Sequence, residues 1–192
     1  FKRELKSFFD SPMAYVFLIV FALLNGWLSS GIDPTKIYVL EPHPSEWLLS
    51  LTLKGLNLNI TPKNKPEVCV IAVKPTKINE VLTSDYFKYD DKMLFISIAA
   101  GTKLQTLNEL LNGEIPIMRV MPNTPATVRK GISCLISNEH TTEIQLRLAE
   151  NLFSVVGETI RLSNEAQMDA VTAISGSGPS YVFYLIEVMA RV

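Results

Sequence analysis

The stretch KMLFISIAAGTKLQTLNELLNG, residues 92–113, joins an apolar run to a segment with helical spacing. After Lys92, residues 93–99 contain a single polar side chain, which is typical of a strand buried on both faces of a sheet. Leucines recur at helical spacing in residues 103–113, and Gly113 closes that segment. A buried strand followed by a helix is the unit from which α/β folds are built.

The same alternation continues on both sides of this unit. Runs rich in Ile, Val and aromatic residues predict further strands at 36–40, 67–73, 115–120 and 131–137. Helical spacing predicts helices at 45–55, 76–82 and 141–157, with Ser45 as a cap and with Gly55 and Gly157 as stops. Apolar strands that alternate with helices predict an α/β fold with a doubly wound parallel sheet, covered by helices on both faces.

Composition excludes several functional classes. The net charge is −1 and the basic residues are scattered, so nucleic acid is not an expected partner. Cys69 and Cys134 both lie in apolar runs, where a thiol is most often a small buried hydrophobe, and a reducing cytoplasm is the expected location. No metal site is predicted, because neither His43 nor His140 has a second histidine or a cysteine at ligand spacing.

The residues that follow the predicted strands are candidate site residues, because open parallel sheets bind ligands beyond the carboxyl ends of their strands. Residues 73–75 offer a lysine beside a rigid proline, and residues 99–101 are small enough for a flat ring or a phosphate to approach. Asn123 and Thr124 are held between two prolines. These strand ends predict a dinucleotide and substrate crevice, although a solvated turn at 73–75 and a structural loop at 121–126 are the alternatives.

Two other segments bear on function. Glu41 follows the run 36–40, where an acidic residue bonds the ribose 2′-hydroxyl in NAD-binding folds, or it is a surface carboxylate. Residues 175–179, SGSGP, do not form a hydrolase nucleophile elbow and are predicted to let two helices pack closely, with Pro179 starting the second. That second helix is apolar almost all round, so it needs burial in a bundle or at a subunit interface.

Four motifs together carry a resemblance to a known family. VKP (73–75), SIAAG (97–101), RVMPNTPA (119–126) and DAVTAISGSGPSYVF (169–183) resemble those of Δ1-pyrroline-5-carboxylate reductases, over roughly residues 22–192. The resemblance implies a Rossmann-like domain at 22–162, followed at 163–192 by the start of an α-helical dimerisation domain, and hence a homo-oligomer. It also implies reduction of a small-molecule substrate, 1-pyrroline-5-carboxylate, to L-proline, with hydride supplied by NADPH or NADH.

The resemblance also implies where ligands would lie, and it assigns no catalytic residue and no metal ligand. Near the nicotinamide end of the cofactor it places Ala72, Val73, Lys74, Pro75, Ile98, Ala99, Ala100 and Asn123. Glu41 and His43 would lie near the adenosine ribose, and Met121, Asn123 and Thr124 near the substrate. Glu41 favours the free 2′-hydroxyl of NADH, whereas His43 or Ser45 would accommodate a phosphate, so the cofactor preference stays open.

The amino-terminal part departs from the family. The family begins with a strand and a Gly-x-Gly-x-x-Gly turn that binds pyrophosphate at a helix N-terminus, but here no glycine precedes Gly26. Residues 1–21, a basic head followed by an apolar run, instead resemble the amino-terminal end of an ABC-2-type transporter permease. We therefore expect a fragment or chimeric reading frame, truncated at both ends relative to the family, with weak cofactor binding.

The uncharged stretch from Ser11 to Ile32 leaves alternatives open. It is long enough to cross a bilayer, which gives membrane contact through 11–32 and an alternative function as a membrane-anchored, non-enzymatic module. In the geometry we favour, AYVFLIV (14–20) is the missing central strand and 22–29 follows as a helix. A third alternative, another Rossmann oxidoreductase acting on a deazaflavin cofactor, agrees with VKP but not with the motif at 169–183.

Overall fold

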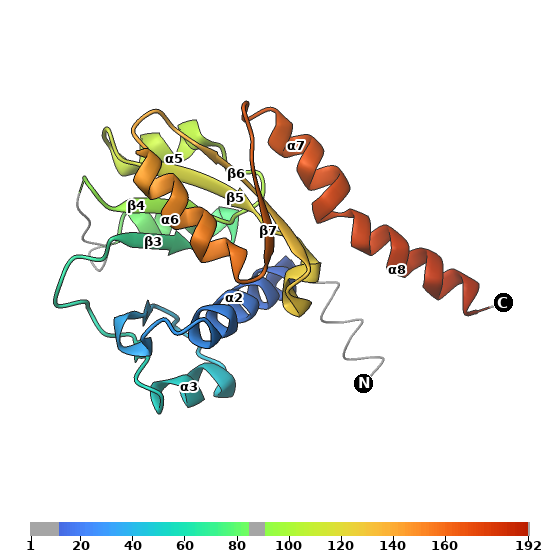
Figure 1. The fold of residues 1–192 in the computed structure, drawn as a ribbon, viewed down its shortest axis with the longest axis horizontal. Coiled ribbons are helices and arrows are strands. Elements are labelled where there is room, and N and C mark those ends of the chain that lie inside the picture. The colour runs from blue at the N-terminus through green and yellow to red at the C-terminus, as the bar shows by residue number, and fades with distance from the viewer. Residues whose placement is uncertain (1–11, 85–90, 192) are drawn as a thin grey trace.

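The computed structural model describes residues 12–84 and 91–191, and Figure 1 shows a central sheet with helices on both faces. The main sheet has five strands in chain order: β3 (Val68–Ile71), β4 (Leu94–Ser97), β5 (Ile117–Met121), β6 (Gly131–Ser137) and β7 (Gly157–Arg161). A second sheet pairs β1 (Tyr38–Val39) with β2 (Asn57–Leu58) in parallel. The predicted α/β class is confirmed, as are the strands expected within 36–40, 67–73, 92–99, 115–120 and 131–137.

The strands of the main sheet do not all run in one direction. β3, β4 and β5 are parallel, with Ile71 opposite Ser97 and Ser97 opposite Arg119. β6 is antiparallel to β5, so the parallel direction expected for the strand at 131–137 is wrong, and β7, which the sequence did not predict as a strand, is parallel to β6. Only residues 122–130 separate β5 from β6, and a parallel neighbour needs a crossover of about a dozen residues or more.

The helices begin and end largely where local signals predict. They are α2 (Pro12–Ser29), α3 (Glu46–Thr52), α4 (Ile78–Leu82), α5 (Leu104–Leu111), α6 (Glu143–Ser154), α7 (Gln167–Val171) and α8 (Gly178–Met189). Short 3₁₀ turns are η1 (Pro34–Lys36), η2 (Pro75–Lys77) and η3 (Thr124–Val128), and η4 (Thr172–Gly176) is a π-helical turn. The Ser45 hydroxyl accepts the Leu48 N–H and caps α3 as predicted. Gly157 opens β7 rather than ending α6, and its φ of +147° brings it against the Gly131 carbonyl.

The apolar stretch near the amino terminus is helical. α2 covers residues 12–29, so the strand expected at 14–20 is wrong and the helix expected at 22–29 is confirmed. Its 18 residues exceed the usual length of a strand. Ile19 and Leu23 are buried against the main sheet, while Leu24 is buried in a second cluster with α3. The helix is apolar all round because it packs between the sheet and α3, as Figure 1 shows.

Close contacts join α2 to α6. The Trp27 indole Nε1 donates to the Leu152 carbonyl at 2.7 Å. Gly26 is buried at this crossing, where an added Cβ would lie 2.6 Å from Val155 Cγ2. Within residues 12–84 and 91–191, no helix combines the length and apolarity needed to cross a bilayer.

Both faces of the main sheet carry an apolar core. On one face α2 and α6 cover the sheet, with a core that contains Leu94, Ile96, Met118, Val120, Leu135, Ala149 and Phe153. On the other face α4 and α5 cover it, with a core that contains Ile78, Leu82, Phe95, Leu107, Leu111 and Ile117. β4 and β5 contribute alternate residues to the two cores and are buried along their whole length.

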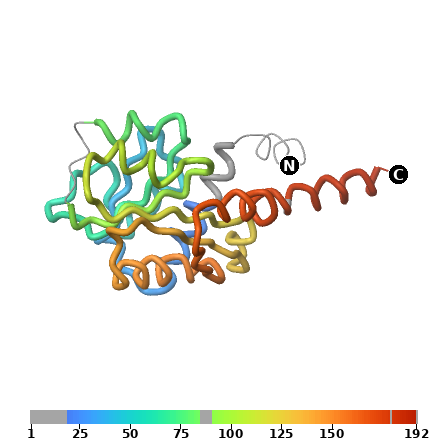
Figure 2. Tube along the Cα trace, turned by 90° about the horizontal axis from the view of Figure 1, so that it is seen from above, coloured from blue at the N-terminus to red at the C-terminus, as the bar shows by residue number. Residues whose placement is uncertain are grey.

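The carboxyl-terminal helix leaves the sheet. Figure 2 shows α8 extending away from the rest of the chain. Its large apolar side chains are exposed, and they include Tyr181, Val182, Tyr184, Leu185, Ile186 and Met189. The burial that the sequence predicts for this helix is therefore not provided by the described part of the chain.

The burial of α2 predicts a stability difference between two leucines. Leu23 is 1% exposed in the core beneath the sheet, whereas Leu53 is 90% exposed. We expect Leu23→Ala to lower the free energy of unfolding by about 2–5 kcal/mol. Leu53→Ala should change it by less than about 0.5 kcal/mol. Urea denaturation of both variants measures the difference, and equal midpoints would mean that α2 does not pack as described.

An ion network predicts acid sensitivity at the junction of α6 and β7. The Arg161 guanidinium bonds Glu143 and Glu150 and holds the pKa of both carboxyls below the ordinary 4.5. A carboxyl whose pKa is lower in the folded than in the unfolded chain stabilises the fold at pH values above its unfolded pKa. This contribution is lost as the pH falls below about 4.5. Arg161→Gln should flatten the loss of stability below that pH, which thermal melts between about pH 3 and pH 7 would detect. An unchanged slope would show that the network does not contribute.

Candidate functional site

The ends of three parallel strands form one edge of the main sheet. The register of β3, β4 and β5 brings the residues after Ile71, Ser97 and Met121 to the same side. After β3, Ala72 and Val73 are half-buried, and Lys74 and Pro75 are exposed where η2 begins. The structure therefore brings together the candidates at 72–75, 98–100 and 121–124.

The end of β4 is open to close approach. Ile98 and Ala99 are buried, and Ala100 and Gly101 are exposed. Gly101 has a φ of +76°, and a Cβ built on it would meet no heavy atom within 4 Å. The backbone here leaves space beside it, as the sequence led us to expect of a site for a flat ring or a phosphate.

The end of β5 carries buried polar groups. The Asn123 side chain accepts the Ile132 N–H at 2.9 Å and donates to the Ser175 hydroxyl at 2.9 Å. The Thr124 hydroxyl is buried, and among the described residues it is the one buried side-chain polar atom without a partner. A buried hydroxyl without a partner is costly, so a ligand that bonds it would gain that free energy.

Helical residues from the far end of the chain reach this edge. Besides the bond between Asn123 and Ser175, Gly176 lies against Met121, since an added Cβ would be 3.0 Å from the Met121 Cε. Both Ser175 and Gly176 belong to the π-helical turn η4, a conformation found frequently at functional sites. Sequence reasoning assigned residues 175–179 to helix packing and missed the contact of Ser175 with Asn123.

An ion pair between a buried arginine and a half-buried glutamate lies beside the same edge. Arg119 of β5 is 6% exposed, and its Nη1 pairs with the Glu165 carboxylate. With Lys103, Ala166 and Asp169 these residues line a pocket of about 180 Å³. Sequence reasoning missed this pair, although an arginine inside the apolar run 115–120 was a signal that a partner would be needed.

Glu41 and His43 lie elsewhere, after β1 in the two-stranded sheet. The Glu41 carboxylate accepts the His43 N–H at 2.9 Å, and the Glu41 backbone is bonded on both sides by the Asn59 side chain. Ser45 is engaged as the cap of α3. These candidates therefore follow a strand of the two-stranded sheet and are not part of the edge formed by β3, β4 and β5.

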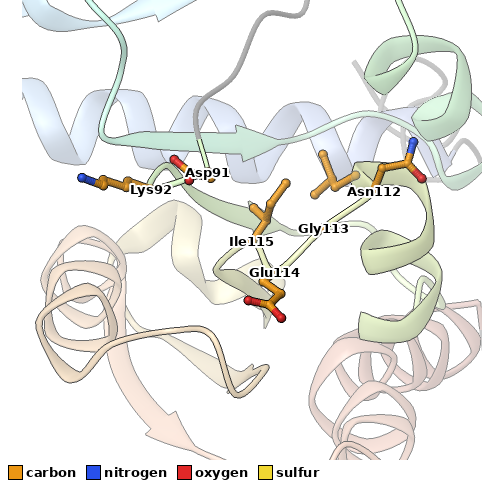
Figure 3. A pocket seen from close by; sticks show the side chains of 7 residues that line it. Asp91, Lys92, Asn112, Gly113, Glu114 and Ile115 are labelled. Carbon is orange, nitrogen blue, oxygen red and sulfur yellow. The ribbon is translucent and has the colours of Figure 1, made fainter.

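A larger pocket, of about 490 Å³, opens at the opposite edge of the main sheet, next to the start of β4 and β5. Its lining includes Lys92, Asn112 and Glu114. Figure 3 shows these three side chains pointing in different directions rather than toward a common centre. Because ligand sites need convergent polar groups, the edge where β3, β4 and β5 end is the better candidate.

Both cysteines are free and unreactive. Burial raises the pKa of the Cys69 thiol to about 12 and also raises that of Cys134. The thiolate is the reactive form, so neither residue is poised for nucleophilic chemistry near neutral pH. Cys134 is buried as the sequence suggests, whereas Cys69 is half-buried on β3.

Comparisons with known proteins agree with the geometry. Residues 165–192 match the family model described as "Pyrroline-5-carboxylate reductase dimerisation". The pyrroline-5-carboxylate reductase of Haemophilus influenzae is 37% identical over 173 residues, or 88% of this chain and 64% of that protein. The enzyme of Pseudomonas aeruginosa is 42% identical over 171 residues, or 88% and 63%. The chain thus spans just under two thirds of the length of these curated relatives.

Solved structures give the same result. The pyrroline-5-carboxylate reductase of Coxiella burnetii superposes with a TM-score of 0.74 at 29% identity, covering 89% of this chain and 65% of that one. The Plasmodium falciparum enzyme, solved with NADP bound, gives 0.71 at 28% identity over 87% and 62%. No comparison supports the resemblance of residues 1–21 to a transporter permease, and residues 1–11 lie outside the described residues. Neither membrane contact through 11–32 nor a membrane-anchored module gains support.

The two bonds of Asn123 predict a graded loss of stability. Asn123→Ala leaves both the Ile132 N–H and the Ser175 hydroxyl without a partner, and we expect it to cost about 1–3 kcal/mol. Ser175→Ala removes only one of these bonds and should cost less. Urea denaturation of both single variants and of the double variant tests the pair. Strictly additive effects of the two changes would indicate that Asn123 and Ser175 do not interact.

Proposed function

We propose that the chain belongs to the pyrroline-5-carboxylate reductase family and takes part in NAD(P)H-dependent reduction of 1-pyrroline-5-carboxylate to L-proline. The observation that carries the proposal is the edge where β3, β4 and β5 end, with the unpartnered Thr124 hydroxyl buried inside it. Such an edge is where open α/β sheets bind dinucleotides.

The residues of this edge suit the nicotinamide half of the cofactor. We assign Ala72–Pro75, Ile98–Ala100 and Asn123 to its walls, and Met121, Asn123 and Thr124 to the place where the nicotinamide meets the substrate. When bound, the nicotinamide would supply the hydride that reduces the imine. The chain's own residues would orient the ring and exclude water, and the Thr124 hydroxyl would gain the partner it lacks from the nicotinamide carboxamide.

The described residues offer no comparable site for the pyrophosphate half of the cofactor. Neither glycine of the segment from α2 to η1 is placed as a phosphate cradle. Gly26 is closed off by Val155, and Gly31 lies after the helix rather than before it. Since backbone N–H groups at a glycine-rich turn normally hold this group, we propose no contact for it and expect weak cofactor binding by this chain.

The choice between NADH and NADPH would be made at the end of β1. A Glu41 carboxylate can bond a free ribose 2′-hydroxyl and would repel a phosphate there, whereas the exposed His43 ring could donate a hydrogen bond to a phosphate. Titration with both nucleotides would decide between them.

The helical segment 165–192 supports a homo-oligomer. We propose that the exposed apolar side chains of α8 are covered by the same helix of a second copy, as the family model for dimerisation suggests. We also propose a domain boundary at residues 162–163, just after β7, with the sheet domain before it and the helical domain after it. The other expected boundary, at residues 21–22, falls inside α2.

Thr124→Val tests the proposal because it should act in opposite directions on stability and on binding. Valine keeps the shape and removes the unpartnered hydroxyl, so the variant without ligand should be as stable as the parent or more stable. Loss of a hydrogen bond to the nicotinamide should weaken NADPH or NADH binding about tenfold. Fluorescence titration measures the binding, and thermal melts measure the stability.

Thr127→Val is the matched control. Thr127 lies three residues further along the same turn, and its exposed hydroxyl donates to the Thr124 carbonyl at 3.0 Å. Its replacement removes this one exposed bond and leaves the Thr124 hydroxyl in place, so it should lower stability slightly and leave the nucleotide affinity unchanged. Equal nucleotide affinities of Thr124→Val and the parent would remove the assigned role of Thr124. Failure of the parent chain to bind either nucleotide would contradict the proposed function for this chain.

A further inference from the structure

The interface between the main sheet and the helical segment 165–192 contains a carboxylate with two separate partners. Glu165 precedes α7 by two residues, and its Oε1 accepts from the Arg119 guanidinium of β5. The same oxygen accepts the backbone N–H of Leu104 at 2.8 Å. Glu165 therefore joins three elements: the strand β5, the start of α5 and the start of the helical segment.

The bond to Leu104 replaces a missing helix cap. Leu104 is the first residue of α5, and the side chain at the N-cap position, Lys103, makes no capping bond. A carboxylate near a helix N-terminus bonds free N–H groups and is favoured by the helix dipole. Glu165 thus acts as the cap of a helix 61 residues away in the chain.

The bond to Arg119 makes the position of Glu165 hard to change. Arg119 is almost fully buried, and a buried guanidinium that loses its partner is strongly destabilising. The start of the helical segment is therefore held at this place on β5. The bond between Asn123 and Ser175 holds the same segment a second time, closer to the end of the strand.

The connection between β4 and α5 ends at this carboxylate. That connection, residues 98–103, contains the residues Ile98–Ala100 assigned to the nicotinamide wall. Its first end is fixed by β4, where the Ile98 N–H bonds the Ile71 carbonyl at 3.1 Å. Its second end is fixed at Leu104 by Glu165. Between these points Ile98, Ala99 and Thr102 are buried, whereas Ala100 and Gly101 are exposed. Gly101 has a positive φ and no atom within 4 Å of an added Cβ, so the position of this exposed part depends on the two fixed ends.

We propose that Glu165 is a positioning residue for the β4–α5 connection, and that it makes the place of the nicotinamide wall depend on docking of the helical segment. Glu165 acts through Leu104 and does not itself contact the cofactor. The second half of this statement rests on the proposed function, whereas the first half concerns the chain without ligand.

Hydrogen exchange tests the first half without any cofactor. In Glu165→Ala, we expect the amides of residues 98–107 to exchange about tenfold faster, because the Leu104 N–H loses its acceptor. Glu165→Gln should restore most of the protection, since its amide oxygen can accept the same two bonds. Asp169→Asn is the matched control, because it removes a negative charge from the same pocket without breaking either bond. Slow amides in the centre of β4 and β5 report on overall stability.

The outcomes distinguish a positioning role of Glu165 at residues 98–107 from a contribution to the stability of the whole fold. The expected result is faster exchange at 98–107 that exceeds the acceleration in the centre of β4 and β5, is restored by glutamine and is absent in Asp169→Asn. Unchanged exchange in Glu165→Ala, or an equal acceleration throughout β4 and β5, would overturn the positioning role.

Nucleotide titration of the same variants tests the second half. NADPH and NADH should bind Glu165→Ala about tenfold more weakly than the parent, in line with the change in exchange. Equal affinities despite faster exchange would show that the connection does not position the nicotinamide. A parent chain that binds neither nucleotide would count against the proposed function and against this half alone, while the exchange result would still decide whether Glu165 positions the connection.

Discussion

The register of three parallel strands is the constraint on which the candidate site depends. Ile71, Ser97 and Arg119 stand opposite one another, so the segments after β3, β4 and β5 have to leave the sheet at one edge. That register is fixed by burial, because β4 and β5 place alternate side chains in two separate cores. A slip of one residue would exchange the two faces and drive Arg119 into the core that contains Met118 and Val120.

The helix α2 joins the two sheets through packing rather than through a strand. It shares one cluster with the main sheet and another with α3, which lies between β1 and β2 in the chain. A strand in this place would align the two sheets by backbone hydrogen bonds, whereas a helix satisfies its own backbone and contributes side chains on several sides. The chain thereby keeps a continuous apolar core while the two-stranded sheet stays separate from the five-stranded one.

Local signals predicted much of the fold, because they act over a few residues. The apolar run 131–137 matches β6 in both limits, and Ser45 caps α3 as its residue type suggests. The direction of β6 was not readable in the same way, since a buried strand looks alike in either direction and only the short loop before it decides. The secondary structure of residues 14–20 was predicted wrongly, because a short apolar run with β-branched residues suits a strand as well as a buried helix.

The site was predictable to the extent that it follows strand ends. Lys74, Ala99 and Asn123 could be placed at one edge from the order of the strands, because every parallel strand ends on the same side. The contributions of Glu165 and Ser175 could not be predicted, since they arrive from residues far along the chain and depend on where a helix docks. Long-range polar pairs leave no periodic signal in a sequence, and Arg119 indicates only that some partner must exist.

Polar contacts hold the helical segment 165–192 against the main sheet. Most of the buried side chains are apolar. Among the described residues the buried polar ones include Ser97, Arg119 and Asn123, which lie on β4 and β5 or just after them, and also Thr102 and, on β6, Ser133. Burying such groups costs free energy unless each is bonded, so apolar contacts would hold the helices at a lower free-energy cost. Arg119 and Asn123 obtain their bonds from Glu165 and Ser175 of the helical segment, whereas Thr124 obtains none. The bonds of Arg119 and Asn123 therefore hold the helical segment against the sheet in a defined position, while the buried Thr124 hydroxyl has no partner among the described residues.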